Sequence, residues 1–226
     1  DTTFTVKATK AGMDDSDEVK FAYTVKAEEP TTVPISTALA GEKDASFTVK
    51  GVVTLVDGQN YYLQDATGGI CLRLAKKTND INLGDTIIGS GKRADFNNLP
   101  QLGSGTFQKS SGLTLRAKST TIGALTPTDV CTYVTISGKG VTEVYDNNGG
   151  FKQPNITVKD ADGKTIQLYK AVINKVDGEW EYKVGDTLDI TAAVSIFKET
   201  LQLRNTNADE VKLHSNVYDP ISDDMI

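Results

Sequence analysis

The stretch LGDTIIGSGKRADFNNLPQL, residues Leu83 to Leu102, returns later in the chain as VGDTLDITAAVSIFKETLQL, residues Val184 to Leu203. The two stretches align without a gap at a constant offset of 101. In the first copy an alternating segment, the turn signal Asn97-Asn98 and a return segment predict a β-hairpin. Six aligned positions carry the same residue: Gly84 and Gly185, Asp85 and Asp186, Thr86 and Thr187, Phe96 and Phe197, Gln101 and Gln202, and Leu102 and Leu203.

The repetition extends upstream of this hairpin. The segment 61–74, YYLQDATGGICLRL, pairs with 155–169, NITVKDADGKTIQLY, and each reads as a strand, a turn that begins Asp-Ala, and a second strand. Before them stand FTVKGVVTLV and VTISGKGVTEV, long strands with an internal glycine, Gly51 or Gly138, that we expect at a β-bulge. A short helix-capable segment precedes each copy. Five strands in this order predict an OB-fold, so the expected fold is all-β, with two tandem OB-like five-stranded Greek-key barrels.

The predicted domain boundaries follow from the repeat. Residues 1–29 are expected to form a short N-terminal β-hairpin, residues 30–118 the first barrel and residues 119–226 the second barrel. The segment EEPTTVP, from Glu28 to Pro34, is the predicted linker, since its prolines keep it extended.

Two resemblances give the repeat a context. TVKGVVTLVDGQNYYLQDATGGICLRL, followed by LGDTIIGSGKRADFNNLPQL, resembles the OB-fold domains of bacterial extracellular nucleases and of tandem surface proteins. TFTVKATKAGMDDSDEVKFAYTVKA resembles the closing strands of the chitobiase C-terminal-like β-sandwich repeat. The resemblance implies a bacterial protein that is secreted, periplasmic or exposed at the cell surface, with other domains of the same parent protein as partners. It also implies that catalytic residues of the nuclease relatives lie on a separate domain.

Charge and composition narrow the classes of ligand. The formal net charge is -6, which disfavours nucleic acid, but residues 30–118 hold ten basic and seven acidic groups, a net charge of +3. Only this middle segment is expected to attract a polyanion. No apolar run has the length of a membrane span, and the two cysteines, Cys71 and Cys131, fit neither a disulfide framework nor a zinc motif.

The sequence predicts no catalytic residues, no metal site and no cofactor. The one histidine, His214, is expected at the solvent-facing end of a strand, without a second histidine or a Gly-x-Ser-x-Gly motif to accompany it. DADGK at Asp160 begins like a calcium loop, but its twelfth position is Ala171, so a hairpin turn is expected there. Hydrolysis by carboxylates alone stays open, because carboxylates that meet only in the fold leave no spacing to read.

A ligand-binding face is predicted on the first barrel. If Leu63 points inward, Tyr61 does too, which leaves Tyr62 and Gln64 on the open face of the second and third strands, where OB-folds bind ligands. An aromatic side chain beside cations suits single-stranded nucleic acid, because a base can stack on the ring while the cations bind the phosphates. The alternatives are a carbohydrate-binding site and a module for adhesion or spacing. The predicted ligand-binding residues are Lys50, Tyr62, Gln64, Arg73, Lys92, Arg93 and Asn97.

Overall fold

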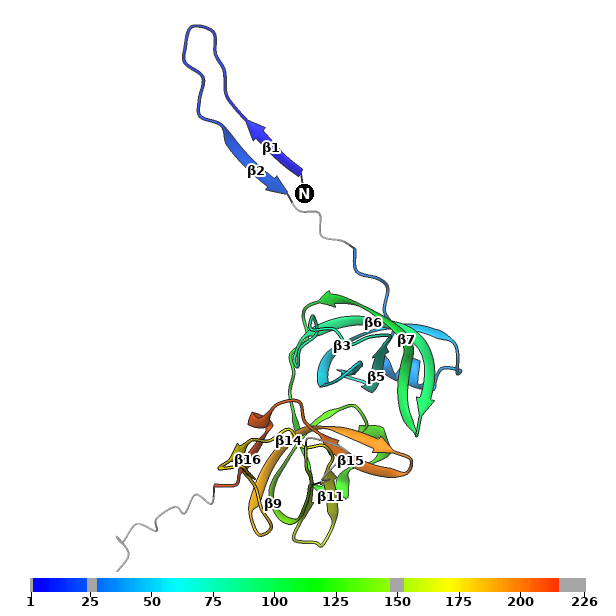
Figure 1. Ribbon diagram of the computed structural model, residues 1–226. Coiled ribbons are helices and arrows are strands. Elements are labelled where there is room, and N and C mark those ends of the chain that lie inside the picture. Colours follow the sequence, from blue (N-terminus) through cyan, green and yellow to red (C-terminus); the bar gives the residue numbers. More distant parts are fainter. Residues whose placement is uncertain (1, 24–27, 147–152, 216–226) are drawn as a thin grey trace, which may run out of the picture. The chain divides into compact units, whose positions relative to one another are not determined.

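The computed structural model describes residues 2–23, 28–146 and 153–215 and divides the chain into two compact units, Asp1–Pro30 and Thr31–Ile226. Within these residues no helix has the length and apolar character needed to cross a membrane. The first unit is a β-hairpin of β1 (Thr2–Val6) and β2 (Val19–Tyr23), with Phe4 opposite Phe21 and all ten strand residues exposed. The second unit contains both barrels (Figure 1).

The first barrel is a closed ring of five strands in the order β3-β4-β5-β7-β6. Neighbouring strands are antiparallel except β5 and β7, which are parallel, and this is the strand order of an OB-fold. A short helix covers one end, where the Ile35 N–H donates to Asp65 Oδ2 at 2.8 Å. The elements are α1 (Ile35–Ala40), β3 (Ser46–Asp57), β4 (Asn60–Asp65), β5 (Gly68–Leu74), β6 (Thr86–Phe96) and β7 (Leu99–Ser110).

The second barrel repeats these pairings. Strands β9, β10, β11, β15 and β14 form a ring that closes through pairing of β14 with β9, and the β11–β15 pair is parallel like β5–β7. The fold is therefore all-β with two OB-like barrels, as the sequence predicted. The elements are β8 (Lys118–Ser119), η1 (Ile122–Ala124), η2 (Pro127–Asp129), β9 (Tyr133–Tyr145), β10 (Asn155–Lys159), β11 (Thr165–Leu168), β12 (Lys175–Val176), β13 (Glu179–Trp180), β14 (Thr187–Phe197), β15 (Thr200–Arg204), η3 (Ala208–Glu210) and β16 (Val211–Leu213).

The repeated glycine closes each barrel in the same way. The Gly84 N–H donates to the Val53 carbonyl at 2.9 Å, and the Gly185 N–H donates to the Val141 carbonyl at 3.0 Å. Both glycines have positive φ, 86° and 98°, a region that other residues enter at a cost. These bonds join the turn before β6 to β3 and the turn before β14 to β9. The two copies keep this glycine because the closing pair of strands begins there.

The β-bulges bend the first strand of each barrel, but only one lies where the sequence predicted. In β9 one shift of register falls at Gly138, which has φ 67°, and a second falls at Thr142, between Val141 and Glu143. In β3 the shift falls between Val53 and Leu55, so the extra residue is Thr54, and the prediction for Gly51 is wrong. A bulge reverses the alternation of side chains that follows it. Consequently Val53 packs in the first barrel's core, whereas Leu55 packs with residues of the second barrel.

The two barrels share a buried junction. Leu55, Tyr62 and Cys71 of the first barrel belong to one hydrophobic cluster with the core of the second. The Tyr62 side chain is 3% exposed, and its hydroxyl lies 2.7 Å from the hydroxyl of Ser195 on β14. Burial raises the pKa of both Tyr62 and Cys71, that of Cys71 to about 12. The junction is therefore packed like a core.

Polar contacts fix the register of this junction. Thr54 Oγ1 donates to the Cys131 carbonyl at 2.8 Å, and the Tyr133 N–H donates to Gln64 Oε1 at 2.8 Å. Gly69 allows the closest approach, because a Cβ there would lie 2.8 Å from the Cys131 Cβ. A buried polar group with a partner stabilises one arrangement, since any other leaves it unpaired.

Replacing Tyr62 tests the junction. We expect Tyr62→Ala to lower the free energy of unfolding by about 3–5 kcal/mol, because it leaves a cavity in a packed core. Tyr62→Phe removes only the hydrogen bond and should cost about 1–3 kcal/mol. Urea unfolding measures both. A cost below about 0.5 kcal/mol for Tyr62→Ala is the behaviour of a surface residue and would contradict the packing.

The repeated aspartate caps the turn before each closing strand. Asp85 Oδ2 accepts a hydrogen bond from the Asn82 N–H at 2.9 Å, and Asp186 Oδ2 accepts one from the Lys183 N–H at 2.8 Å. Asp85 also pairs with Lys109 at 2.8 Å. The hydrogen bond from Lys109, opposed in part by burial and helped by Asn82, holds the pKa of Asp85 below its ordinary value of 3.8.

The pH dependence of stability follows from this pair. A lowered carboxyl pKa stabilises the folded state above the unfolded pKa, and this stabilisation is lost as the pH falls through the folded pKa. Since both partners are partly exposed, Lys109→Met should cost about 0.5 kcal/mol at neutral pH and nothing in strong acid. Urea unfolding of both proteins from pH 7 to below the Asp85 pKa measures this. A cost that is the same at every pH would show that the ion pair does not contribute.

Candidate functional site

The face predicted to bind ligand is covered by the second barrel. The predicted alternation is right, because Tyr61 and Leu63 lie in the first barrel's core while Tyr62 and Cys71 point outward. The prediction that Tyr62 and Gln64 lie on an open face is wrong. Tyr62 is buried in the junction, and Gln64 is half-buried with its oxygen committed to the Tyr133 N–H. Sequence alternation finds the side of a strand, but it does not reveal what packs on that side.

Three of the predicted cations lie on strands other than β4 and β5. Arg93 is only 8% exposed, and its Nη1 pairs with Asp95 Oδ1 at 2.6 Å and donates to the Ala94 carbonyl, so little of its guanidinium is accessible to a ligand. Lys92 is exposed on β6 opposite Ser46 of β3. Lys50 is half-buried on β3. The predicted set therefore does not form one basic patch.

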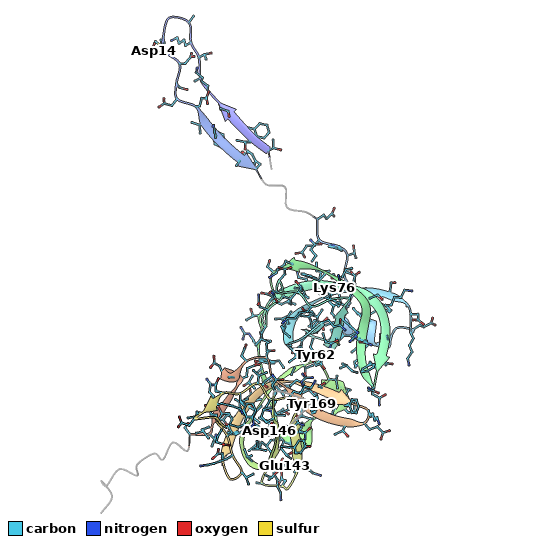
Figure 2. All side chains as sticks on the ribbon, in the orientation of Figure 1. Asp14, Tyr62, Lys76, Glu143, Asp146 and Tyr169 are labelled. Carbon is cyan, nitrogen blue, oxygen red and sulfur yellow. The ribbon has the colours of Figure 1, made fainter. Side chains whose placement is uncertain are left out.

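Of the predicted ligand-binding residues, Tyr62 and Arg73 line a cleft between the two barrels. Its cavity volume is about 170 Å³, and side chains from both barrels line it. Tyr62 and Tyr169, which lie on facing sides of the barrels in Figure 2, both contribute. The lining residues are Asp57, Asn60, Tyr62, Arg73, Phe96, Leu99, Gln101, Tyr169, Ser195, Ile196, Phe197, Gln202 and Arg204.

Equivalent residues of the two copies come together in this cleft. Phe96 and Phe197 end the strands β6 and β14, and Gln101 and Gln202 lie on the return strands β7 and β15. Phe96 is 62% exposed and Phe197 is 51% exposed, so neither ring serves a barrel core. The repeat thus places two copies of one aromatic–amide pair around a single cavity.

The turns that carry the two phenylalanines contact each other. The Lys198 N–H donates to the Asn97 carbonyl at 2.8 Å, and Asn98 Nδ2 donates to the Lys198 carbonyl at 2.7 Å. Asn97 and Asn98 have φ 50° and 67°, which fits the two-residue hairpin turn predicted from the sequence. Asn97, a predicted ligand residue, is exposed. Its backbone carbonyl joins the β6–β7 hairpin to the β14–β15 hairpin.

Two arginines line the cleft, and only one of them, Arg204, forms a salt bridge among the described residues. Arg204 is nearly buried, with 11% of its side chain exposed, and its Nη2 lies 3.1 Å from Asp57 Oδ2. Its guanidinium stands over the Tyr169 ring at 5.4 Å, and its Nε is buried without a hydrogen-bond partner. Arg73 is exposed and donates from Nη1 to Asn60 Oδ1 at 3.2 Å. Among the described residues it forms no salt bridge, so its charge is uncompensated.

A shallower groove continues from the cleft along the first barrel. Its volume is about 430 Å³, and Arg73 lines both hollows, so this side chain stands where they meet. The other groove residues are Gln59, Leu74, Ala75, Ser104, Gly105 and Thr106. Lys76 and Lys77 follow directly in the chain, and both are exposed. The groove thus has one charged lining residue, Arg73, among polar and apolar ones.

The residues available for metal binding or acid–base chemistry are dispersed. Within residues 2–23, 28–146 and 153–215, no group of three or more His, Cys, Asp and Glu side chains could hold a metal ion. His214 directly follows β16, and its Nδ1 lies 2.8 Å from Asp189 Oδ1. This pair joins the end of β16 to β14, away from the cleft.

Sequence reasoning missed most of the cleft. Of the lining residues, Tyr62 and Arg73 were predicted, whereas Phe96, Phe197, Gln101, Gln202 and Tyr169 were not. A usable signal was present, because Phe96 and Gln101 belong to the six identities of the repeat. Turns, strand starts and barrel cores explain four of these identities, at Gly84, Asp85, Thr86 and Leu102. No such structural role explains Phe96 and Gln101, which makes them candidates for a shared function.

Comparison with known proteins shows distant structural similarity. No protein-family model matches the chain, and no curated protein matches it. Among solved structures, the Ifi202 HINa domain in complex with a 20-bp dsDNA is 12% identical over 76% of this chain and 97% of that one, with a TM-score of 0.36. A murine DNA-binding protein bound with dsDNA is 10% identical over 74% and 99%, at 0.35, and Drosophila Unr CSD456 is 10% identical over 81% and 68%, at 0.24. We assign no ligand to this chain from similarities at this level.

Proposed function

We propose that this chain is a non-catalytic binding module that holds single-stranded nucleic acid at the cleft between its barrels. The observation that carries the proposal is the exposure of Phe96 and Phe197 on one cavity beside the uncompensated Arg73. Unstacked bases bind to exposed aromatic rings regardless of sequence, and cations beside the rings track the phosphates. The two rings are exposed around one cavity rather than scattered singly over the surface, which is typical of a binding site.

The path of the strand follows from the two hollows. Bases stack in the cleft, where the phenylalanines lie, and the phosphate backbone passes Arg73 into the groove beside Lys76 and Lys77. The net charge of +3 in residues 30–118 supports this direction, because the second barrel is acidic and offers little attraction to phosphate. The first barrel therefore holds the backbone, and both barrels hold the base.

Carbohydrate binding is the second candidate. Asn60, Gln101 and Gln202 give the cleft an amide-rich lining, and an aromatic ring beside amides also suits a sugar. The two ligands differ in their response to salt, since only the nucleic acid releases counterions when it binds. We also propose that the parent protein is secreted or exposed at the bacterial cell surface, as the OB-domain resemblance implies.

Binding of an oligothymidylate of about 16 nucleotides tests the proposal. Phe96→Ala and Phe197→Ala should each weaken binding by about 1–3 kcal/mol, because each removes a stacking platform. Tyr145→Ala is the control, since Tyr145 is 52% exposed on β9 and does not line the cleft. Fluorescence polarisation at low ionic strength gives the affinities.

The salt dependence of the same titration tests the role of Arg73. Arg73→Ala should reduce the slope of log affinity against log salt by about one, whereas Lys92→Ala should leave it unchanged. No binding at low salt would refute nucleic acid as the ligand. Binding of a glycan that is insensitive to salt and lost in Phe96→Ala would favour carbohydrate instead.

A further inference from the structure

Two glutamines of the cleft have uncommitted amides. Gln101 on β7 lies opposite Cys71 of β5, and Gln202 on β15 lies opposite Gln167 of β11, so the parallel ladders hold them in equivalent places. Both are half-buried and line the cleft. Within the described part of the chain neither side-chain amide makes a hydrogen bond. By contrast, Asn205 uses both ends of its amide within the protein.

Such amides can distinguish between bases, which aromatic stacking cannot do. A primary amide presents a donor and an acceptor side by side, which match a neighbouring acceptor and donor on the edge of a base. Aromatic faces accept any planar ring, whereas a site built to hydrogen-bond a polar edge rejects an analogue without it. The phenylalanines and the glutamines therefore act on different parts of one ligand, its face and its edge.

The size of the cavity limits how much of a nucleic acid can enter it. At about 170 Å³ it is smaller than the about 300–1,000 Å³ of an ordinary small-molecule pocket. It has room for one ring and not for a base pair. In a duplex the pairing edge of each base is already occupied, so only an unpaired base can offer it to the amides.

We propose that Gln101 and Gln202 are specificity-determining residues that read the hydrogen-bonding edge of one unpaired base. This inference rests on the proposed function, since it requires a nucleic acid in the cleft. It adds two consequences: the site discriminates against bases without a polar edge, and it selects single strands over duplexes of the same sequence.

A nonpolar base isostere tests the edge contact. The ligand is an oligonucleotide of abasic residues that carries a single thymine or, at the same position, a single difluorotoluene, which keeps the shape of thymine and lacks its strong hydrogen bonding. The wild-type protein should bind the thymine form about tenfold more tightly. Gln101→Leu and Gln202→Leu should each reduce this ratio towards one. Gln108→Leu, a half-buried glutamine of β7 outside the cleft, should keep the ratio.

Each outcome decides the inference. Equal binding of the two oligonucleotides by the wild type, a ratio that survives in both leucine variants, or tighter binding of the duplex than of its single strand would overturn it. In the first two cases oligothymidylate still binds and the proposed function stands, whereas tighter binding of the duplex counts against both. If no oligonucleotide binds at low salt, both fail. Gln101→Glu, which keeps the shape and an acceptor but loses the donor, and the urea midpoint of each variant separate a lost contact from a lost fold.

Discussion

The docking of the second barrel onto the β4–β5 face of the first is the constraint on which the rest of the structure depends. It begins with one extra residue in β3, Thr54, which turns Leu55 out of its own barrel and towards the next. Tyr62 fills the junction, and Gly69 lets the two backbones approach. An OB-fold ordinarily keeps this face for a ligand. Here the second barrel occupies it, and the residues of the cleft lie at the rim, where the hairpin ends meet.

The rim is where equivalent residues of the two copies meet. Each copy alone presents one exposed phenylalanine and one amide on the end of a hairpin, too little to enclose a ring. Because the junction brings equivalent hairpin turns together at Asn97 and Lys198, the two pairs face one cavity. Arg73 adds a charge from the first barrel only. The site is thus nearly symmetric in its stacking groups and asymmetric in its electrostatics, as the charges of the two halves of the sequence indicate.

The sequence predicts the barrels better than the site, for a physical reason. Strand order, the Asn97-Asn98 turn and the inward direction of Tyr61 all depend on local alternation and turn chemistry, and these were predicted correctly. The bulge at Thr54 was assigned to Gly51, because any residue can form such a bulge and glycine only makes it easier. The exposure of Tyr62 and the partner of Arg93 depend on contacts between distant segments. Periodicity within one strand contains no information about those contacts.

The central claim is that the β4–β5 face of the first barrel is sealed by the second barrel in the folded protein. Cys71 and Cys131 report on it directly, since both thiols are free and fully buried on opposite sides of the junction. The most direct measurement is the rate of thiol alkylation of the native protein, followed by mass spectrometry across a urea series. If the face is sealed, both thiols react only as the whole second unit unfolds. Rapid alkylation of Cys71 in buffer, with the barrels still folded by circular dichroism, would show that the face is open and would contradict it.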